Sequence, residues 1–75
     1  MEFDYSKLRG RIIEKFGSIK AFAEADGRSF VTISKKLNGK VAISPEDIVK
    51  WSAPELLDIQ PGEYHLYFFV KKVHD

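Results

Sequence analysis

The chain has 75 residues, no cysteine and a formal net charge of +1, with 12 lysines and arginines against 11 aspartates and glutamates. A chain of this length buries about 60% of the surface that its unfolded form exposes, which leaves little room for an enclosed active site. The lack of cysteine excludes disulfide scaffolds, cysteine-ligated zinc and thiol nucleophiles. We therefore expect residues 1–75 to form a single binding domain that is not an enzyme.

The remaining composition gives no sign of a catalytic or metal centre. His65 and His74 are the two histidines, and their spacing matches neither a zinc-hydrolase motif nor a catalytic triad. We expect no cofactor, no metal and no catalytic residue. The chain also lacks a signal-peptide pattern and any run of about 18 apolar residues. This predicts a cytoplasmic protein that does not enter a membrane.

The charges are segregated along the chain. Residues 5–20 carry five bases and one acid, residues 28–43 carry four bases and no acid, and residues 44–63 carry five acids and one base. This distribution predicts a two-sided molecule whose basic side can contact phosphates. The alternative is that these charges lie on solvated helix faces and serve solubility alone.

A first helix is predicted between a capping residue and a glycine. Asp4 can cap its N-terminus, and Gly17 supplies the left-handed conformation that ends it. The apolar residues of this helix stand at steps of four: Leu8, Ile12 and Phe16. Such a stripe is expected to face the core.

Residues 18–39 hold two further short helices, separated by a glycine-containing break. Ser18 can cap the second helix, which Gly27 ends, and Ser29 can cap the third, which Asn38-Gly39 end. The third helix is basic on its outer face. This arrangement is typical of a helix-turn-helix, whose second helix usually enters the major groove of DNA.

The fourth predicted helix has the clearest start. Ser44 offers a hydroxyl cap, Pro45 takes the first helical position, and two carboxylates follow in the first turn. Pro54 cannot lie deep in a helix, and Ser52 with Glu55 can cap a new one. A kink or a restart of the helix is therefore expected at that point.

The segment from Pro61 onward permits two structures. Apolar residues alternate over residues 64–70 as in a strand, while Pro61 can open a short helix instead. The aromatic side chains here exceed what one face of a small helical core can hide, which predicts a homodimer contact. The residues expected to contribute to it are drawn from Leu66, Phe68, Phe69 and Val70. The alternative is a tail folded back over its own monomer.

A further pattern runs through the predicted helix pair: Ala21, Phe22, Ala23, Glu24, Gly27, Ser29, Thr32, Ile33, Ser34, Leu37, Asn38, Gly39 and Lys40. It resembles the lambda-repressor/Cro-like (XRE-type) helix-turn-helix superfamily. The opening YSKLRGRIIEKFGS and the ending YFFVKKV are similar to small regulators of phages and prophages of Gram-positive bacteria. The resemblance implies an all-α domain of about five short helices that binds operator DNA as a dimer. Some such proteins instead bind a phage repressor.

The resemblance also implies which residues read bases. These positions lie on the outer face of the helix 29–38, at Phe30, Val31, Ser34 and Lys35. Lysine can donate to a guanine edge and serine to several bases, whereas apolar side chains contact only the thymine methyl. For Phe30 the alternative is that it packs inward, while Val31 is expected to be exposed.

Phosphate contacts are expected from other residues of the unit: Lys20, Ser29, Lys36, Asn38 and Lys40. Ser29 and the amides of the following helical turn can hold one phosphate, and the residues at the end of that helix another.

The sequence also departs from the superfamily pattern. Ile19 replaces a glutamine that often contacts DNA, and Asp26 and Arg28 place charges beside the turn. These charges predict either an exposed turn or looser packing.

Two functions remain. The first is a Cro-like transcriptional repressor that inserts the helix 29–38 into the major groove of double-stranded operator DNA. The second is an antirepressor that binds another phage regulator through protein–protein contacts. The basic run from Arg28 to Lys40 favours the first function, and the apolar pair Phe30 and Val31 favours the second.

Overall fold

Short helices joined by tight turns make up most of the chain, as the spacing of capping residues and glycines predicts. Within residues 3–72, which the computed structural model describes, the elements are α1 (Ser6–Phe16), α2 (Ile19–Asp26), α3 (Phe30–Leu37), α4 (Pro45–Ser52), a 3₁₀ turn (Pro61–Glu63) and α5 (Tyr64–Tyr67). An isolated antiparallel bridge joins Phe3 to Lys71, and no longer strand forms in these residues. The prediction of an all-α domain is confirmed.

The turns between the first three helices follow from local chemistry. Gly17 and Gly27 end α1 and α2 with φ angles of 82° and 86°, in the left-handed region that favours glycine. The hydroxyls of Ser18 and Ser29 accept hydrogen bonds from backbone amides in the first turns of α2 and α3. These caps satisfy amides that have no partner inside the helix.

Helix α4 begins with a complete capping box. Ser44 accepts a hydrogen bond from the amide of Asp47, and the Asp47 carboxylate accepts one from the amide of Ser44. Pro45 occupies the first turn, as predicted.

Two predicted caps are wrong. Tyr5, not Asp4, is the N-cap residue of α1, and its side chain makes no capping hydrogen bond. Asp4 lies one residue earlier, where its side chain accepts a hydrogen bond from the amide of Ser6 at 2.8 Å. Helix α4 ends at Ser52 and does not restart, because the amide of Leu57 donates to the carbonyl of Trp51 and turns the chain back. The Ser52 hydroxyl is buried and has no hydrogen-bond partner among the described atoms.

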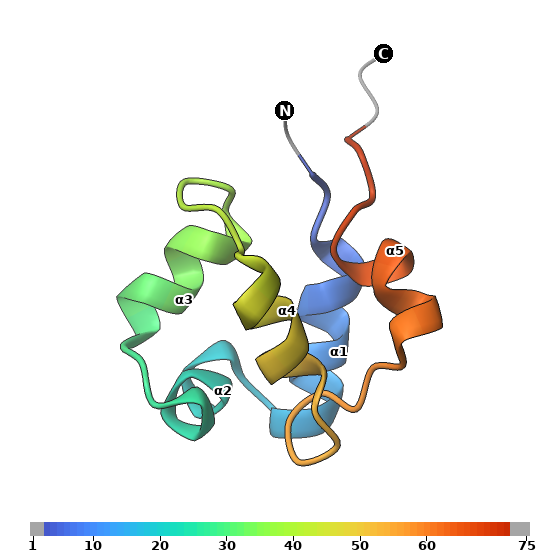
Figure 1. Cartoon of the computed structure of the whole chain (residues 1–75). Helices are drawn as coiled ribbons and strands as arrows, with labels where there is room; N and C mark the ends of the chain where they lie inside the picture. Colours follow the sequence, from blue (N-terminus) through green and yellow to red (C-terminus); the bar gives the residue numbers. More distant parts are fainter. Residues whose placement is uncertain (1–2, 73–75) are drawn as a thin grey trace.

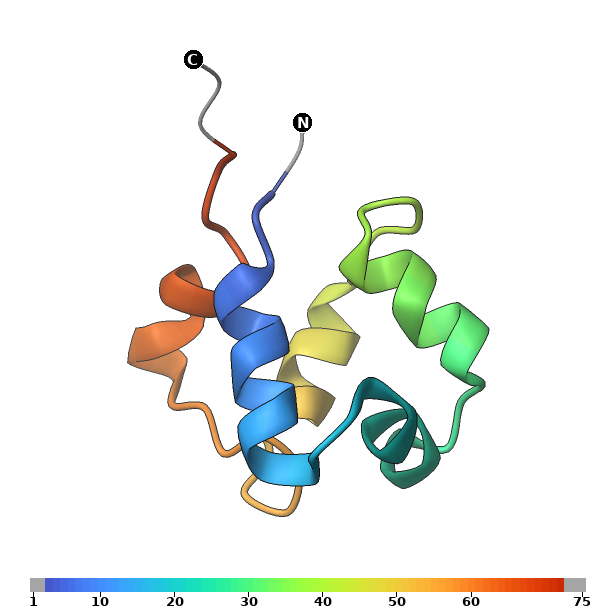
Figure 2. The same ribbon diagram turned by 180° about the vertical axis from the view of Figure 1, so that it is seen from behind.

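The core is centred on Trp51 of α4. Its indole meets the ring of Phe22 edge to face, with 5.3 Å between the ring centroids. The buried apolar residues come from α1 to α4, from the segment after α4 and from the residue that follows α5: Leu8, Ile12, Phe22, Ala23, Ile33, Leu37, Ile48, Trp51, Leu57, Ile59 and Phe68. Helix α4 lies between α1 and α3 (Figures 1 and 2).

The C-terminal segment forms a helix rather than a strand. Pro61 opens the 3₁₀ turn that leads into α5, and α5 packs on α1. The following residues run beside the N-terminal segment, where the amide of Asp4 donates to the carbonyl of Val70 at 2.6 Å. The segment before α1 and the segment after α5 therefore lie side by side on one side of the molecule (Figures 1 and 2).

This arrangement corrects one of the residues predicted for a dimer contact. Phe68 is 2% exposed and belongs to the core of its own monomer, so a partner copy cannot reach it. Leu66, Phe69 and Val70 are exposed, and their part in a dimer stays a prediction.

No helix in residues 3–72 combines the length and the apolar character that crossing a membrane requires.

The neighbouring phenylalanines provide a test of the fold. Phe68→Ala removes a ring from the core and is expected to lower the free energy of unfolding by about 3–5 kcal/mol. Phe69→Ala removes a half-exposed ring and is expected to cost about 1 kcal/mol or less. Urea denaturation followed by circular dichroism measures both. Similar losses for the two variants would contradict the placement of Phe68.

Candidate functional site

The outer face of α3 is more apolar than is usual for a solvent-exposed helix. Phe30 and Val31 are 49% and 58% exposed, and Lys35 follows one turn later with an exposed side chain. Ser34 is half-buried. The alternative that Phe30 packs inward is wrong, because Ile33 and Leu37 fill the buried face of α3 without it. The four predicted base-reading positions therefore lie on or beside one accessible face.

Lys36, by contrast, is not an exposed cation. It is 8% exposed, and its ammonium donates a hydrogen bond to the carboxylate of Asp47 on α4. The prediction that Lys36 contacts a phosphate is therefore corrected. Within the described part of α3, Lys35 is the one exposed basic residue.

The Asp47 carboxylate connects α4 to both ends of α3. Its Oδ1 accepts a hydrogen bond from Nη2 of Arg28 at 2.7 Å, just before α3, and its Oδ2 accepts from Lys36 in the last turn of α3. Because both ends are held, α3 cannot rotate on α4 without breaking an ion pair. These contacts fix which side chains α3 presents outward.

A second buried carboxylate, that of Asp26, lies at the end of α2. It accepts hydrogen bonds from Nε of Arg28 at 2.7 Å and from the indole of Trp51 at 3.2 Å. Nζ of Lys50 stands 3.1 Å from the same carboxylate. The charges beside the turn therefore pair with each other. Gly27 and Ser29 of the turn are exposed, as one of the two sequence-based alternatives predicted, while the Asp26 carboxylate is buried.

The pKa values of both carboxyl groups reflect this pairing. Burial raises the pKa of Asp47, but the hydrogen bonds and charges of Lys36 and Arg28 outweigh it and hold the value at about 2. For Asp26, burial is likewise outweighed by Arg28 and Lys50, so its pKa is lowered. The same pairing raises the pKa of Arg28. Both carboxylates therefore remain ionised at neutral pH.

The other predicted phosphate contacts lie in different surroundings. Lys20 and Lys40 are exposed. Ser29 is exposed as well, but its hydroxyl already accepts a hydrogen bond from the amide of Thr32 at 3.2 Å. Asn38 accepts a hydrogen bond from Arg9 through its side-chain oxygen. That these four residues contact phosphates stays a prediction.

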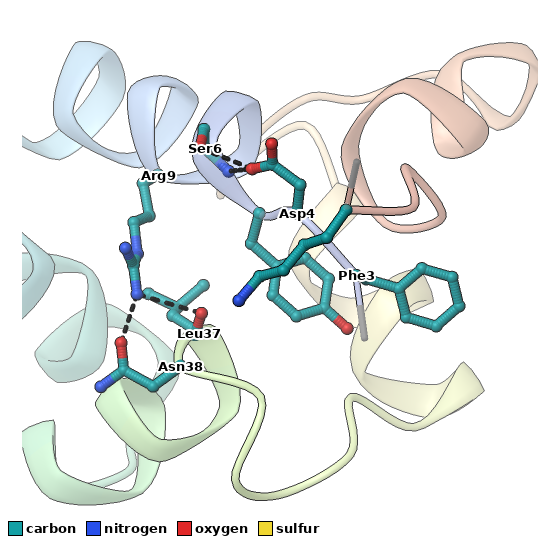
Figure 3. Close-up of a pocket in the computed structure, with 8 residues that line it drawn as sticks. Phe3, Asp4, Ser6, Arg9, Leu37 and Asn38 are labelled. Atoms are coloured by element: carbon teal, nitrogen blue, oxygen red, sulfur yellow. Dashed lines mark hydrogen bonds between the residues drawn. The ribbon is translucent and has the colours of Figure 1, made fainter. Parts of the chain in front are cut away.

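A polar hollow adjoins the C-terminal end of α3. It has a volume of about 490 Å³ and lies between the N-terminal segment, the start of α1 and the end of α3 (Figure 3). Nη2 of Arg9 donates to the carbonyl of Leu37 at 3.0 Å and to the side chain of Asn38. Asp4 and Lys72 also line the hollow. No local sequence pattern indicates this hollow, because its walls come from segments far apart in the chain.

Comparisons with known proteins bear on the family of this chain. The model of a family described as "Protein of unknown function (DUF739)" matches residues 1–71. The solution structure of the modulator of repression (MOR) of the temperate bacteriophage TP901-1 from Lactococcus lactis is similar, with a TM-score of 0.80 and 43% sequence identity. The match covers 99% of this chain and 97% of that one. No curated protein matches the sequence.

These comparisons do not extend to the lambda-repressor/Cro-like superfamily, so that resemblance stays a prediction.

The pairing of Asp47 predicts an acid-sensitive fold. A carboxyl group whose pKa falls from 3.8 to about 2 on folding stabilises the protein fully above about pH 4 and loses that contribution as the pH falls to about 2. The loss amounts to about 2 kcal/mol. In Asp47→Asn we expect lower stability at pH 7 and a shallower decline on acidification, measured by urea denaturation at each pH.

The matched control is Glu46→Gln, which changes the exposed neighbouring carboxylate of α4. It is expected to follow the wild-type pH profile. A profile for Asp47→Asn parallel to that of the wild type would contradict a stabilising role for this carboxylate.

Proposed function

We propose that this chain, which belongs to the DUF739 family, is a phage regulatory protein that modulates repression by binding a repressor protein through the outer face of α3. Support comes from a modulator of repression with 43% identity over nearly the whole chain. The proposal favours the antirepressor over the Cro-like repressor of the two functions that the sequence leaves open.

The exposed apolar pair on α3 carries the proposal. Phe30 and Val31 are adjacent and about half exposed, on a helix whose orientation is fixed by Asp47. Burying such side chains in a protein interface removes apolar surface from water, and aromatic residues are enriched at the centres of interfaces. On DNA the same side chains would gain little beyond contact with thymine methyl groups.

The burial of Lys36 points the same way. Affinity for DNA depends on cations that neutralise phosphates. With its ammonium bound to Asp47, Lys36 does not add to the positive charge of the face that carries Phe30 and Val31. Lys35 remains there as an exposed cation, which suits a mixed apolar and polar interface.

Direct binding to operator DNA is the second candidate. The side chains of Lys20, Lys35 and Lys40 favour it, because exposed lysines are typical contacts to phosphates and base edges. This function requires a homodimer on a palindromic site in the usual geometry of such proteins. Leu66, Phe69 and Val70 are the predicted dimer-contact residues that are exposed.

A binding experiment tests the main proposal. The purified chain is titrated with the repressor encoded in the same phage or prophage genome, and affinity is measured by calorimetry. Phe30→Ala and Val31→Ala are each expected to weaken binding at least about tenfold, as central interface residues do. Val49→Ala, which truncates a 65% exposed valine on α4, is the matched control and should change affinity less than about twofold.

An electrophoretic shift with DNA from the promoter region of the same gene separates the two functions. We expect no specific band for the chain alone, and release of the repressor from its operator when the chain is added. A specific band that Lys35→Ala abolishes would instead establish groove reading and contradict the antirepressor function.

A further inference from the structure

The polar hollow at the C-terminal end of α3 has the features of an anion site. We propose that it accepts a carboxylate side chain of the same partner protein that covers Phe30 and Val31. This inference rests on the proposed function, because it assigns a second contact to that partner. The hollow offers a volume of about 490 Å³, which admits an acidic side chain together with part of the chain that carries it.

Two cationic side chains, those of Arg9 and Lys72, supply hydrogen-bond donors to the hollow. Arg9 has five N–H groups, of which those on Nη2 serve Leu37 and Asn38. The Nε and Nη1 groups of Arg9 have no acceptor among the described residues. The ammonium of Lys72 forms no ion pair with a carboxylate in residues 3–72. Both side chains line the same hollow, and each can donate charge-assisted hydrogen bonds to a carboxylate.

The one carboxylate that lines the hollow does not cancel these charges. Oδ1 of Asp4 accepts hydrogen bonds from the amide of Ser6 at 2.8 Å and from its hydroxyl at 2.5 Å (Figure 3). These bonds, with smaller contributions from the charges of Lys72 and Arg9, lower the pKa of Asp4. Two cations therefore face one engaged carboxylate, and a net positive charge remains.

The surface of α3 connects the hollow to the apolar pair. Val31, Lys35 and Asn38 stand at positions i, i+4 and i+7, so they form one stripe that leads from the exposed valine to the wall of the hollow. The eight residues of α3 span about 12 Å at 1.5 Å per residue. A partner that contacts both ends must therefore bridge roughly the length of this helix between its apolar side chain and its carboxylate.

A protein carboxylate suits this surface better than a DNA phosphate. The backbone of a duplex is a continuous line of charge, and it favours surfaces that are positive along their length. Here the positive hollow is followed by Lys35, the single exposed cation in the described part of α3, and then by Val31 and Phe30, which would place apolar surface against that line. A carboxylate on an otherwise apolar protein surface matches both parts.

A titration followed by nuclear magnetic resonance tests the hollow without the partner. The ¹⁵N-labelled chain is titrated with a tetraglutamate peptide. We expect saturable shifts at the Arg9 Nε–H and the Asn38 side-chain amide, which Lys72→Glu abolishes. The matched control is Lys71→Glu, because Lys71 is the exposed lysine immediately before Lys72 and does not line the hollow. No shifts, or equal shifts in both variants, would overturn the site.

The repressor itself tests the assignment to the partner. Lys72→Glu is expected to weaken binding of the repressor at least about fivefold more than Lys71→Glu does. A charge at an interface acts mainly on the partner group next to it, and here only Lys72 lines the hollow. Equal losses of affinity in the two variants would overturn the second contact.

If the wild-type chain fails to bind the repressor, the proposed function is wrong, whereas the peptide titration still decides whether the hollow binds carboxylates. Shifts at Arg9 with duplex DNA, and none with the peptide, would assign the hollow to nucleic acid.

Discussion

The ion pairs of Asp47 hold together the surface on which the proposed function depends. One carboxylate in the first turn of α4 accepts hydrogen bonds from Arg28, Lys36 and the amide of Ser44. A buried ion pair adds little stability compared with apolar residues of similar size in its place, but breaking it leaves an uncompensated charge inside the protein. If α3 separated from α4 or rotated on it, the ammonium of Lys36 would become such an uncompensated charge. The apolar contacts of Ile33 and Leu37 alone would set the distance of α3 from the core but resist its rotation less.

The same contact changes the character of α3. A cation that binds Asp47 is withdrawn from the outer surface, so the helix keeps its orientation at the expense of positive charge on its exposed face. A helix that binds a duplex needs that charge, whereas a helix that binds a protein needs apolar area and a few polar contacts. The ion pair of Lys36 thus fixes the orientation in which Phe30 and Val31 are exposed and also lowers the positive charge of that face. Both effects suit a protein partner.

Features that depend on residues close together in the sequence could be predicted, whereas contacts between distant residues could not. Caps and glycines act within a few residues, so the predicted ends at Ser18, Gly27 and Ser44 agree with the structure. The partner of Lys36 lies 11 residues away, and the sequence does not show that pairing directly. A signal was nevertheless present, because Lys36 stands three positions after Ile33 and shares its buried face.

The two ends of α3 differ in a way that restricts how a partner can lie on it. The N-terminal end presents Phe30 and Val31, and the C-terminal end leads into the donor-rich hollow lined by Arg9 and Lys72. A surface with an apolar patch alone can be covered in many orientations, because apolar contact is not directional. Adding a charged contact at a fixed distance favours one orientation, since the reversed one would place a carboxylate on apolar side chains and leave it without donors. Polarity along a helix of two turns thus gives this small surface directional specificity.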